Sequence, residues 1–403
     1  MSRETVDQDE QGVTAILNDL LGSWFMSIVL PAIILQSVLI GGGYATGREI
    51  VEYGAQYGAS GWIAVIGIWI GFSVMAVLTF ELARVFGVYN YKSFIKELIW
   101  KAWPLFDLLF LAMAILIIAI MASAAGEIME ETLGVPYLAG IVAIIAVVGV
   151  LAYYGAWLIE EFKTIGSAGL YVAFILFAGI VIVSTWGDIT STFAASDTSY
   201  ADDTSTGAVV QSGILYVGYN LAVFPAVFFA LHRQTTRKET LTAGLLAGTL
   251  MSLPFALSYV AMMGFYPQES VMGAPVPWLP MLESVGGTTI IVLYGIVVGW
   301  TLIETSVGLI HAILDRIDAD VEEVDAGPME DVEGLSRIHR GALGVGILVG
   351  AMALSQFGII ALVAQGYTLM AYFFIALFAI PLLTVGVYRI FNPDWKVEFW
   401  TNA

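Results

Sequence analysis

The chain has 403 residues, of which 59% are hydrophobic and only 12% are charged. Soluble globular domains normally carry about 25% charged residues, so this composition, with a mean hydropathy of +0.86, excludes a soluble protein and predicts several membrane spans. The sequence contains no cysteine, which excludes disulfides, thiolate metal sites and cysteine nucleophiles.

The formal net charge is -19, and the acidic residues gather outside the apolar runs. They lie largely in the N-terminal tail, in residues 191–206 and in residues 315–333, where we expect a solvated surface. Acidic, lysine-poor surfaces resemble those of proteins from salt-loving (halophilic) organisms, in which salt screens the self-repulsion. This charge also argues against a nucleic acid as partner.

The first apolar run follows an acidic segment, residues 1–23, that has no basic region and no small-residue cleavage site. We therefore expect no removable signal peptide and a mature chain that begins near Met1. A membrane span needs roughly 20 apolar residues. This criterion predicts an all-α protein with one transport domain at 24–393 and a C-terminal tail at 394–403. Its ten helices are expected at residues 24–54, 61–86, 104–129, 136–158, 164–186, 212–231, 240–264, 288–314, 338–357 and 359–390.

Two further segments are predicted not to span. Tyr89 to Trp103 alternates aromatic residues with lysines, which indicates an amphipathic helix on the membrane surface. Pro267 to Gly287 is rich in proline and has a short hydrophobic centre, which is typical of a folded outer loop.

The basic residues near the span ends set the orientation, because Lys and Arg concentrate on the cytoplasmic side. If the chain has ten spans, every Lys and Arg residue near a span end except Arg48 lies on the same side of the membrane. The loops after spans three, five, seven and nine contain no Lys or Arg. We therefore predict a multi-pass protein of the cell membrane with both termini in the cytoplasm.

Glycines interrupt the first predicted span. The stretch from Met26 to Ile40 has only fifteen residues, about 22 Å of helix at roughly 1.5 Å per residue, which is too short to cross a core of about 30 Å. The following residues, Tyr44 to Glu49, are too polar for lipid contact. Unwound backbone at this depth lines a cavity, so we expect amides near Gly42, Gly43 and Tyr44 to hold a carboxylate, with Thr46 beside them. The alternative is that the glycines only allow close helix packing.

The sixth predicted span has a matching interruption at Tyr219, Asn220 and Pro225. Proline lacks an N–H and disfavours helix just before itself, which frees carbonyls around residue 221. An Asn amide with the rings of Tyr219 and Phe224 could enclose a small polar solute. The alternative is a proline kink packed by aromatic residues. A pair of broken helices at corresponding places in two halves points to a secondary transporter with its site at the bilayer midplane.

Two charged positions lie inside predicted spans, where charges are costly and are functional candidates. Arg48 is expected to act as a gate, paired with an acid such as Glu49 or Glu52, or else to reach the outer headgroups. Glu304, deep in the eighth span, could pair with a buried donor, carry a proton, or add charge near a bound cation.

The string LIGGGYATGREIVEYGAQYGASGW is similar to the segment from the first to the second helix of APC-superfamily transporters with the LeuT-type fold, and more narrowly resembles the YkvI-type amino acid permeases. The resemblance implies a five-plus-five inverted repeat, with a first repeat at 24–186 and a second at 212–390. It also implies that Arg48 is an outer-gate arginine and that Gly42, Gly43 and Tyr44 bind the substrate.

The same resemblance implies a sodium site. The backbone carbonyls of Val38 and Gly41 match those that hold the ion, and the hydroxyls of Thr305 and Ser306 stand where their partners are expected. Oxygen ligands suit a hard cation. The alternative for the two hydroxyls is a hydrogen bond to the carbonyl one turn earlier. The chain departs from the sodium symporters at Glu304, which is adjacent to this pair and keeps proton coupling open.

Other classes of function find less support. No H-E-x-x-H, G-x-S-x-G or P-loop motif is present, so we expect no enzyme and no ATP-driven pump. The sequence favours a sodium-coupled symporter of an amino acid or similar small carboxylated solute, working by alternating access. The alternatives are a proton-coupled permease that uses Glu304, or a transporter-like solute sensor. Apart from the sodium ion we expect no cofactor, and the expected partners are the solute and the lipid bilayer.

Overall fold

The computed structural model describes residues 22–39, 42–154, 171–325 and 337–393, and within these residues all regular structure is helical. Two shorter apolar helices, Tyr137–Tyr153 and His339–Ser355, and a pair bent by 72°, Tyr171–Ser184 with Trp186–Ala194, match predicted spans four, nine and five. Seven helices match the other spans in chain order and are long and apolar enough to cross a membrane: Gly22–Leu39, Ala55–Phe86, Tyr91–Leu133, Thr206–Arg233, Arg237–Met263, Thr289–Ile317 and Ile359–Phe391.

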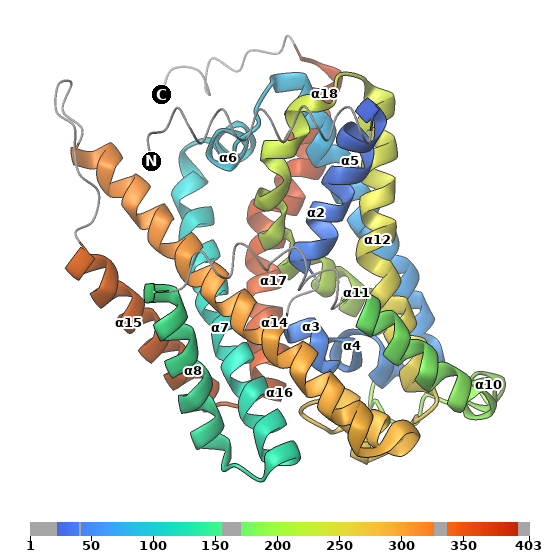
Figure 1. Ribbon diagram of the computed structural model, residues 1–403. Coiled ribbons are helices and arrows are strands. Elements are labelled where there is room, and N and C mark those ends of the chain that lie inside the picture. The colour runs from blue at the N-terminus through green and yellow to red at the C-terminus, as the bar shows by residue number, and fades with distance from the viewer. Residues whose placement is uncertain (1–21, 40–41, 155–170, 326–336, 394–403) are drawn as a thin grey trace.

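The helices follow one another with short connections (Figure 1). Short stretches of 3-10 or π-helix are labelled η. The first half contains η1 (Phe25–Val29), α2 (Leu30–Leu39), α3 (Gly42–Thr46), α4 (Arg48–Tyr53), η2 (Ala55–Gly61), α5 (Trp62–Phe86), α6 (Tyr91–Ile99), η3 (Trp100–Ala102), α7 (Trp103–Leu133), α8 (Tyr137–Tyr154) and α10 (Trp186–Ala194). The second half contains α11 (Thr206–Asn220), η4 (Leu221–Arg233), α12 (Arg237–Met263), α13 (Glu269–Met272), α14 (Trp278–Asp325), α15 (Arg337–Ser355), α16 (Ile359–Ala361), η5 (Leu362–Tyr367), α17 (Thr368–Phe374), η6 (Ile375–Ala379), η7 (Leu382–Gly386) and α18 (Val387–Phe391).

The first and sixth spans are both broken. The sequence predicted the first break at Gly41 to Gly43. Gly41 lies outside the described residues, Gly42 and Gly43 belong to α3, and the described break is at Gly47, whose φ of 83° separates α3 from α4. In the sixth span, α11 ends at Asn220, and a 3-10 segment containing Pro225 continues in its place. The proline accounts for this change, because it has no N–H for a helical hydrogen bond.

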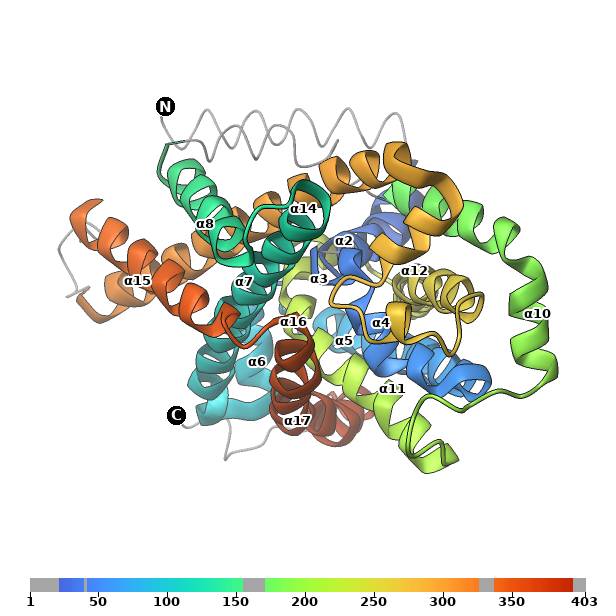
Figure 2. The same ribbon diagram turned by 90° about the horizontal axis from the view of Figure 1, so that it is seen from below.

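The spans pack in two groups (Figure 2). In one group, α5 lies along α12 and α11, while α2 packs on α12 and η4. In the other, α7, α8, α14 and α15 pack on one another. The short α3 contacts α7 and α14, so the break in the first span lies where the two groups meet.

Small residues bring α5 and α12 close together. A Cβ atom added at Gly244 would lie 2.6 Å from the backbone nitrogen of Val77, and one added at Gly248 would lie 2.6 Å from the backbone nitrogen of Ser73. Close backbone approach through small residues is a general means of helix association in membranes, where lipid offers no hydrophobic driving force between helices. The first packing group therefore has a tightly joined centre.

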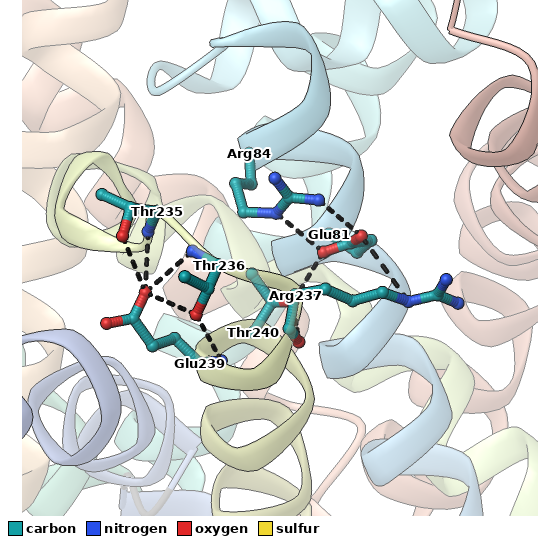
Figure 3. A network of polar contacts seen from close by, with 7 residues as sticks. All are labelled: Glu81, Arg84, Thr235, Thr236, Arg237, Glu239 and Thr240. Carbon is teal, nitrogen blue, oxygen red and sulfur yellow. Dashed lines mark hydrogen bonds and ion pairs between the residues drawn. The ribbon is translucent and has the colours of Figure 1, made fainter.

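A charged network ties the same two helices at their ends near the start of α12 (Figure 3). The carboxylate of Glu81 accepts hydrogen bonds from Arg84 Nη2 at 2.7 Å and from Thr240 Oγ1 at 2.6 Å, and lies 3.9 Å from Arg237 Nε. Glu239 completes a capping box at the N-terminus of α12. Glu81 thus pairs with Arg84 on its own helix and with the start of α12.

Two ion pairs lie inside the second packing group. Asp107 on α7 pairs with Arg316 on α14, whose guanidinium lies 3.8 Å from the ring centroid of Tyr91. Asp315 on α14 pairs with Arg340 on α15 at 2.6 Å. Each of these pairs therefore joins helices that already pack together.

The two segments predicted not to span are also present. α6 covers most of the predicted amphipathic segment, and the ammonium of Lys92 lies 4.4 Å from the ring centroid of Trp103. The predicted outer loop contains α13 and the first turns of α14, which bends at Gly287, where φ is 62°.

Candidate functional site

The break in the first span lies beneath the loop between α13 and α14. Gly47 adopts a left-handed conformation, and a Cβ atom here would lie 2.8 Å from Trp278 Cδ1 and 2.9 Å from Met262 Cε. Trp278 is fully buried. Only glycine combines this backbone conformation with such close approach of a side chain, so the loop is seated directly on the break.

The residues before Gly47 make hydrogen bonds to two helices, α12 and α14. The side chains of Tyr44 and Thr46 are fully buried. Tyr44 Oη lies 3.4 Å from Ser258 Oγ on α12, and Tyr294 Oη on α14 donates to the Ala45 carbonyl at 2.8 Å. α3 is thereby held between the two packing groups.

Arg48 is 5% exposed and binds the outer loop rather than lipid headgroups. Its Nη1 donates to the carbonyls of Met272 at 2.7 Å and Ala274 at 3.3 Å, and its Nη2 lies 3.5 Å from a carboxylate oxygen of Glu52. Arg48 thus pairs with Glu52, one of the two acids that the sequence offered, and links α4 to the loop that covers it.

Glu49 takes a different direction. It is also 5% exposed, and Tyr219 Oη donates to its Oε2 at 2.6 Å. Because Glu49 belongs to α4 and Tyr219 to α11, this hydrogen bond joins the first broken span to the sixth. The sequence singled out both residues but did not predict that they meet.

Tyrosine rings surround this hydrogen bond. Tyr219 stacks on Tyr367 of η5, with ring centroids 4.3 Å apart and planes inclined by 18°. Tyr53 and Tyr216 each lie 5.5 Å from Tyr219 between ring centroids. Tyr53 Oη also donates to the Val363 carbonyl at 3.3 Å, which connects α4 to the tenth span.

The remaining predicted residues of the sixth span lie in its packed interior. Asn220 is buried, and its Nδ2 donates to the Tyr216 carbonyl at 2.8 Å within α11. Phe224 is fully buried, with its ring centroid 5.9 Å from that of Phe378. In this conformation both side chains are therefore engaged in contacts within the protein.

The predicted sodium ligands are on helices that pack in different groups. Val38 lies near the end of α2, and Gly41 falls outside the described residues. On α14, Thr305 is half-buried, and Ser306 is buried and donates to the Leu302 carbonyl at 2.8 Å. Ser306 thus makes the hydrogen bond to the preceding turn that the sequence offered as the alternative to ion binding. Ser306 also borders a small pocket lined by α7, α8 and α15.

The other predicted positions lie on α3 and α14. Gly42 and Gly43 begin α3, and Glu304 is buried within α14. Tyr44 is fully buried, and a pocket of about 10 Å³ is lined by two residues that it contacts, Phe174 and Ser258. A space of this size holds about one water molecule, so no room for a solute is open at these two residues in this conformation.

Three residues of the site were not predicted from the sequence. Trp278 could have been noticed as a large aromatic residue after two prolines in the outer loop. Tyr367 follows a Gln-Gly pair that interrupts the apolar tenth span, and Tyr53 follows Glu52 in the polar part of the first. Each signal is weak, because aromatic residues are also common in ordinary membrane-helix packing.

No protein-family model matches the chain. The uncharacterized membrane protein YkvI of Bacillus subtilis (strain 168) is 23% identical over 239 residues, a match that covers 57% of this chain and 65% of the relative. This chain thus matches just under two thirds of its relative's length.

Solved structures share the fold. MhsT in complex with L-phenylalanine matches with a TM-score of 0.59 and 14% identity, over 90% of this chain and 96% of that chain. The inward-facing conformation of Mhp1 matches with a TM-score of 0.54 and 14% identity, over 91% and 77%. A Na⁺-coupled sialic acid symporter in its substrate-bound, outward-open state matches with a TM-score of 0.51 and 13% identity, over 91% and 86%.

YkvI is named as a membrane protein and the sialic acid symporter as Na⁺-coupled, in agreement with the expectation of a membrane protein, and none of the four is named as an enzyme. At such low identities the structural matches establish the fold alone. The chain is similar to YkvI over 239 residues and shares the LeuT-type fold of these solved structures.

Proposed function

We propose that the protein is a secondary active transporter that carries a small carboxylated solute, such as an amino acid, together with sodium by alternating access. The observation that carries the proposal is the meeting of two broken spans through the hydrogen bond from Tyr219 to Glu49. Broken helices of this kind expose backbone groups at membrane depth, where they bind solutes and ions. The sharing of the fold with a Na⁺-coupled symporter and with a protein solved with L-phenylalanine supports the choice of ion and solute.

The solute carboxylate would bind at the start of α3. Backbone N–H groups of Gly42, Gly43 and Tyr44 belong to the first turn of this short helix, where they lack partners within the helix. Thr46 would contribute from the end of α3. Tyr219, Asn220 and Phe224 would enclose the rest of the solute from the sixth span once it moves relative to the first.

Arg48 and the outer loop would form the external gate. The guanidinium holds two loop carbonyls, and Trp278 seats the loop on Gly47, so release of these contacts would open a path to α3 from outside. The closed region around Tyr44 fits a conformation in which this gate is shut.

Sodium would bind between α2 and α14, held by the carbonyls of Val38 and Gly41 and the hydroxyls of Thr305 and Ser306. The Ser306 hydroxyl can donate its proton to the Leu302 carbonyl and still offer an oxygen lone pair to the ion. An ion that binds one arrangement of two packing groups better than another shifts the protein toward that arrangement. Sodium would thereby favour the conformation that receives the solute.

The same proposal places both termini in the cytoplasm of a cell-membrane protein. This orientation is supported by the basic residues, which lie in the loops after the even-numbered predicted spans and in both terminal tails.

Uptake of a labelled amino acid mixture into proteoliposomes tests the function directly. An inward sodium gradient is compared with a potassium control and with an inward proton gradient, at high ionic strength. Accumulation that requires sodium is the expected result. Accumulation driven only by protons would contradict sodium coupling, and the absence of accumulation under every gradient would contradict amino acid transport.

A further inference from the structure

Glu49 is a buried carboxyl group that binds neither the outer loop nor the solute in the proposed function. It is 5% exposed, and within the described residues it receives one hydrogen bond, from Tyr219 Oη at 2.6 Å. The adjacent cation, Arg48, is directed to the outer loop and to Glu52. Glu49 therefore lacks the cationic partner that a buried carboxylate normally has.

The elements around α4 bring tyrosines and no further cation toward this group. α4 packs against α3, η2, α11, α12 and η5. The titratable or charged residues on the outer parts of these elements and on α4 itself are Tyr44, Arg48, Glu52, Tyr53, Tyr57, Tyr216, Tyr219, Tyr259 and Tyr367. Of these, Tyr219 is the one whose hydroxyl binds Glu49, while Tyr53 donates to the Val363 carbonyl and Tyr259 to the Gly58 carbonyl at 2.7 Å.

Burial of an ionised carboxylate costs several kcal/mol unless a cation or several donors replace the lost water. One tyrosine hydroxyl replaces only part of that hydration. A neutral carboxyl group accepts the same hydrogen bond from Tyr219 on its carbonyl oxygen, and its own proton removes the uncompensated charge. The closed arrangement of α4, α11 and η5 therefore favours the protonated form.

Contacts between α4 and the tenth span decide whether water reaches Glu49. Tyr53 Oη binds the Val363 carbonyl and lies 3.3 Å from Thr368 Oγ1, and Tyr367 stacks on Tyr219. Separation of α4 from η5 breaks these contacts and uncovers the face of α4 that carries Glu49. Once hydrated, the carboxyl group can release its proton to external water.

We propose that Glu49 is a proton-binding site of the outer gate, protonated while α4 and η5 are in contact and deprotonated when they separate. The inference rests on the proposed alternating-access function, to which it adds a second ligand, the proton, on the outer side. By linkage, a proton that binds the closed arrangement better must favour closure. Low external pH therefore closes this gate and high external pH opens it.

Thiol labelling tests the proposal, because the chain has no native cysteine. Val363→Cys introduces a thiol at a fully buried position under Tyr53. Its labelling rate by a membrane-impermeant reagent is measured in nanodiscs between about pH 5 and about pH 9. Each rate is divided by that of Ser199→Cys, an exposed position in the outer loop after α10, to remove the intrinsic pH dependence of thiol reactivity.

The normalised rate is expected to rise with pH. The rise is up to about tenfold for each tenfold difference between the affinities of Glu49 for a proton when α4 and η5 are in contact and when they are separated. With Glu49→Gln, which mimics the neutral carboxyl group, labelling is expected to be slow and independent of pH. The matched control Glu52→Gln, one turn along the same helix, is expected to keep the pH dependence. A similar pH dependence with and without Glu49→Gln overturns the proposal, as does a flat profile in the Val363→Cys protein that retains Glu49.

The readout needs neither sodium nor a solute. Failure of the inference can therefore be distinguished from failure of sodium-coupled uptake, which is measured separately in proteoliposomes. A further contrary result is a normalised labelling rate that changes with sodium concentration at constant pH and does not change with pH. That result would show that sodium alone controls the outer gate, and it would overturn the role of Glu49.

Discussion

Arg48 and Glu49 are neighbours in the sequence, yet their charged groups serve different parts of the molecule. Successive residues of an α-helix point about 100° apart, whereas residues four apart share a face. Arg48 accordingly meets Glu52, and Glu49 turns toward α11. The four-residue spacing selects Glu52 only if residues 48–53 are helical, and the sequence predicted unwound backbone beside them, so it offered both acids as partners of Arg48 without a choice between them.

Replacement of Arg48 by glutamine should release the outer loop. Hydrogen bonds to a charged group contribute about 1.5–3 kcal/mol, so amide hydrogen exchange of residues 269–278 should become about tenfold faster or more. Hydrogen–deuterium exchange with mass spectrometry measures this. Glu52→Gln, which removes only the 3.5 Å ion pair, should have a smaller effect. Unchanged exchange in Arg48→Gln would contradict the gate.

Replacement of Thr305 and Ser306 by alanine should weaken the response to sodium. If both hydroxyls are ligands, the sodium concentration for half-maximal uptake should rise about tenfold or more, equivalent to about 1.4 kcal/mol. Sodium titration of uptake into proteoliposomes gives this value. Ser252→Ala removes a hydroxyl that likewise bonds within its own helix, to the Gly248 carbonyl, and should leave the titration unchanged. An unaltered sodium response in the double variant would remove the site from α14.

The broken spans show what could be predicted at the scale of elements. Apolar length predicted the order and approximate limits of the membrane helices, and Pro225 predicted the break in the sixth span, because these are local properties of the chain. In the first span the break at Gly47 lies beyond the glycine run that predicted it, because its position depends on the contact with Trp278. Contacts between distant segments were not predictable in the same way. The stacking of Tyr367 on Tyr219 and the seating of Trp278 on Gly47 depend on how helices far apart in sequence pack, for which a single sequence carries little information.

Gly47→Ala should disrupt the closed arrangement of the first span. A left-handed conformation costs about 1–2 kcal/mol for a residue with a Cβ atom, and here that atom would also lie 2.8 Å from Trp278 Cδ1. The melting temperature in detergent should fall, and tryptophan fluorescence should report a displaced Trp278. Gly295→Ala in α14, where an added Cβ atom meets nothing within 4 Å, should leave both unchanged. Equal behaviour of the two variants would show that the loop does not depend on Gly47.

At the scale of the whole molecule, the net charge of -19 is the dominant electrostatic property. Repulsion among surface acids destabilises a compact protein unless salt screens it. The screening length falls from about 10 Å at 0.1 M salt to about 3 Å at 1 M. Within the described residues, the acids that pair with arginines include Glu52, Glu81, Glu97, Asp107 and Asp315.

The melting temperature should therefore rise with salt from about 0.1 M to about 1 M. Potassium chloride is the appropriate salt, because it separates screening from sodium binding. Thermal unfolding in detergent measures the effect, and an equal rise with sodium chloride is expected once any specific sodium effect has saturated. A melting temperature that stays constant or falls would show that the acids do not repel one another appreciably in the folded protein.

The ion pairs near the start of α12 and around α14 have a consequence for how the protein sits in its bilayer. Glu81 pairs within one packing group, and Asp107 and Asp315 pair within the other, so sliding of one group past the other leaves all three carboxylates neutralised. The charge contributed by these three pairs then stays nearly constant when one packing group moves against the other. The affinity of this part of the protein for anionic lipids should for this reason not change with such a movement.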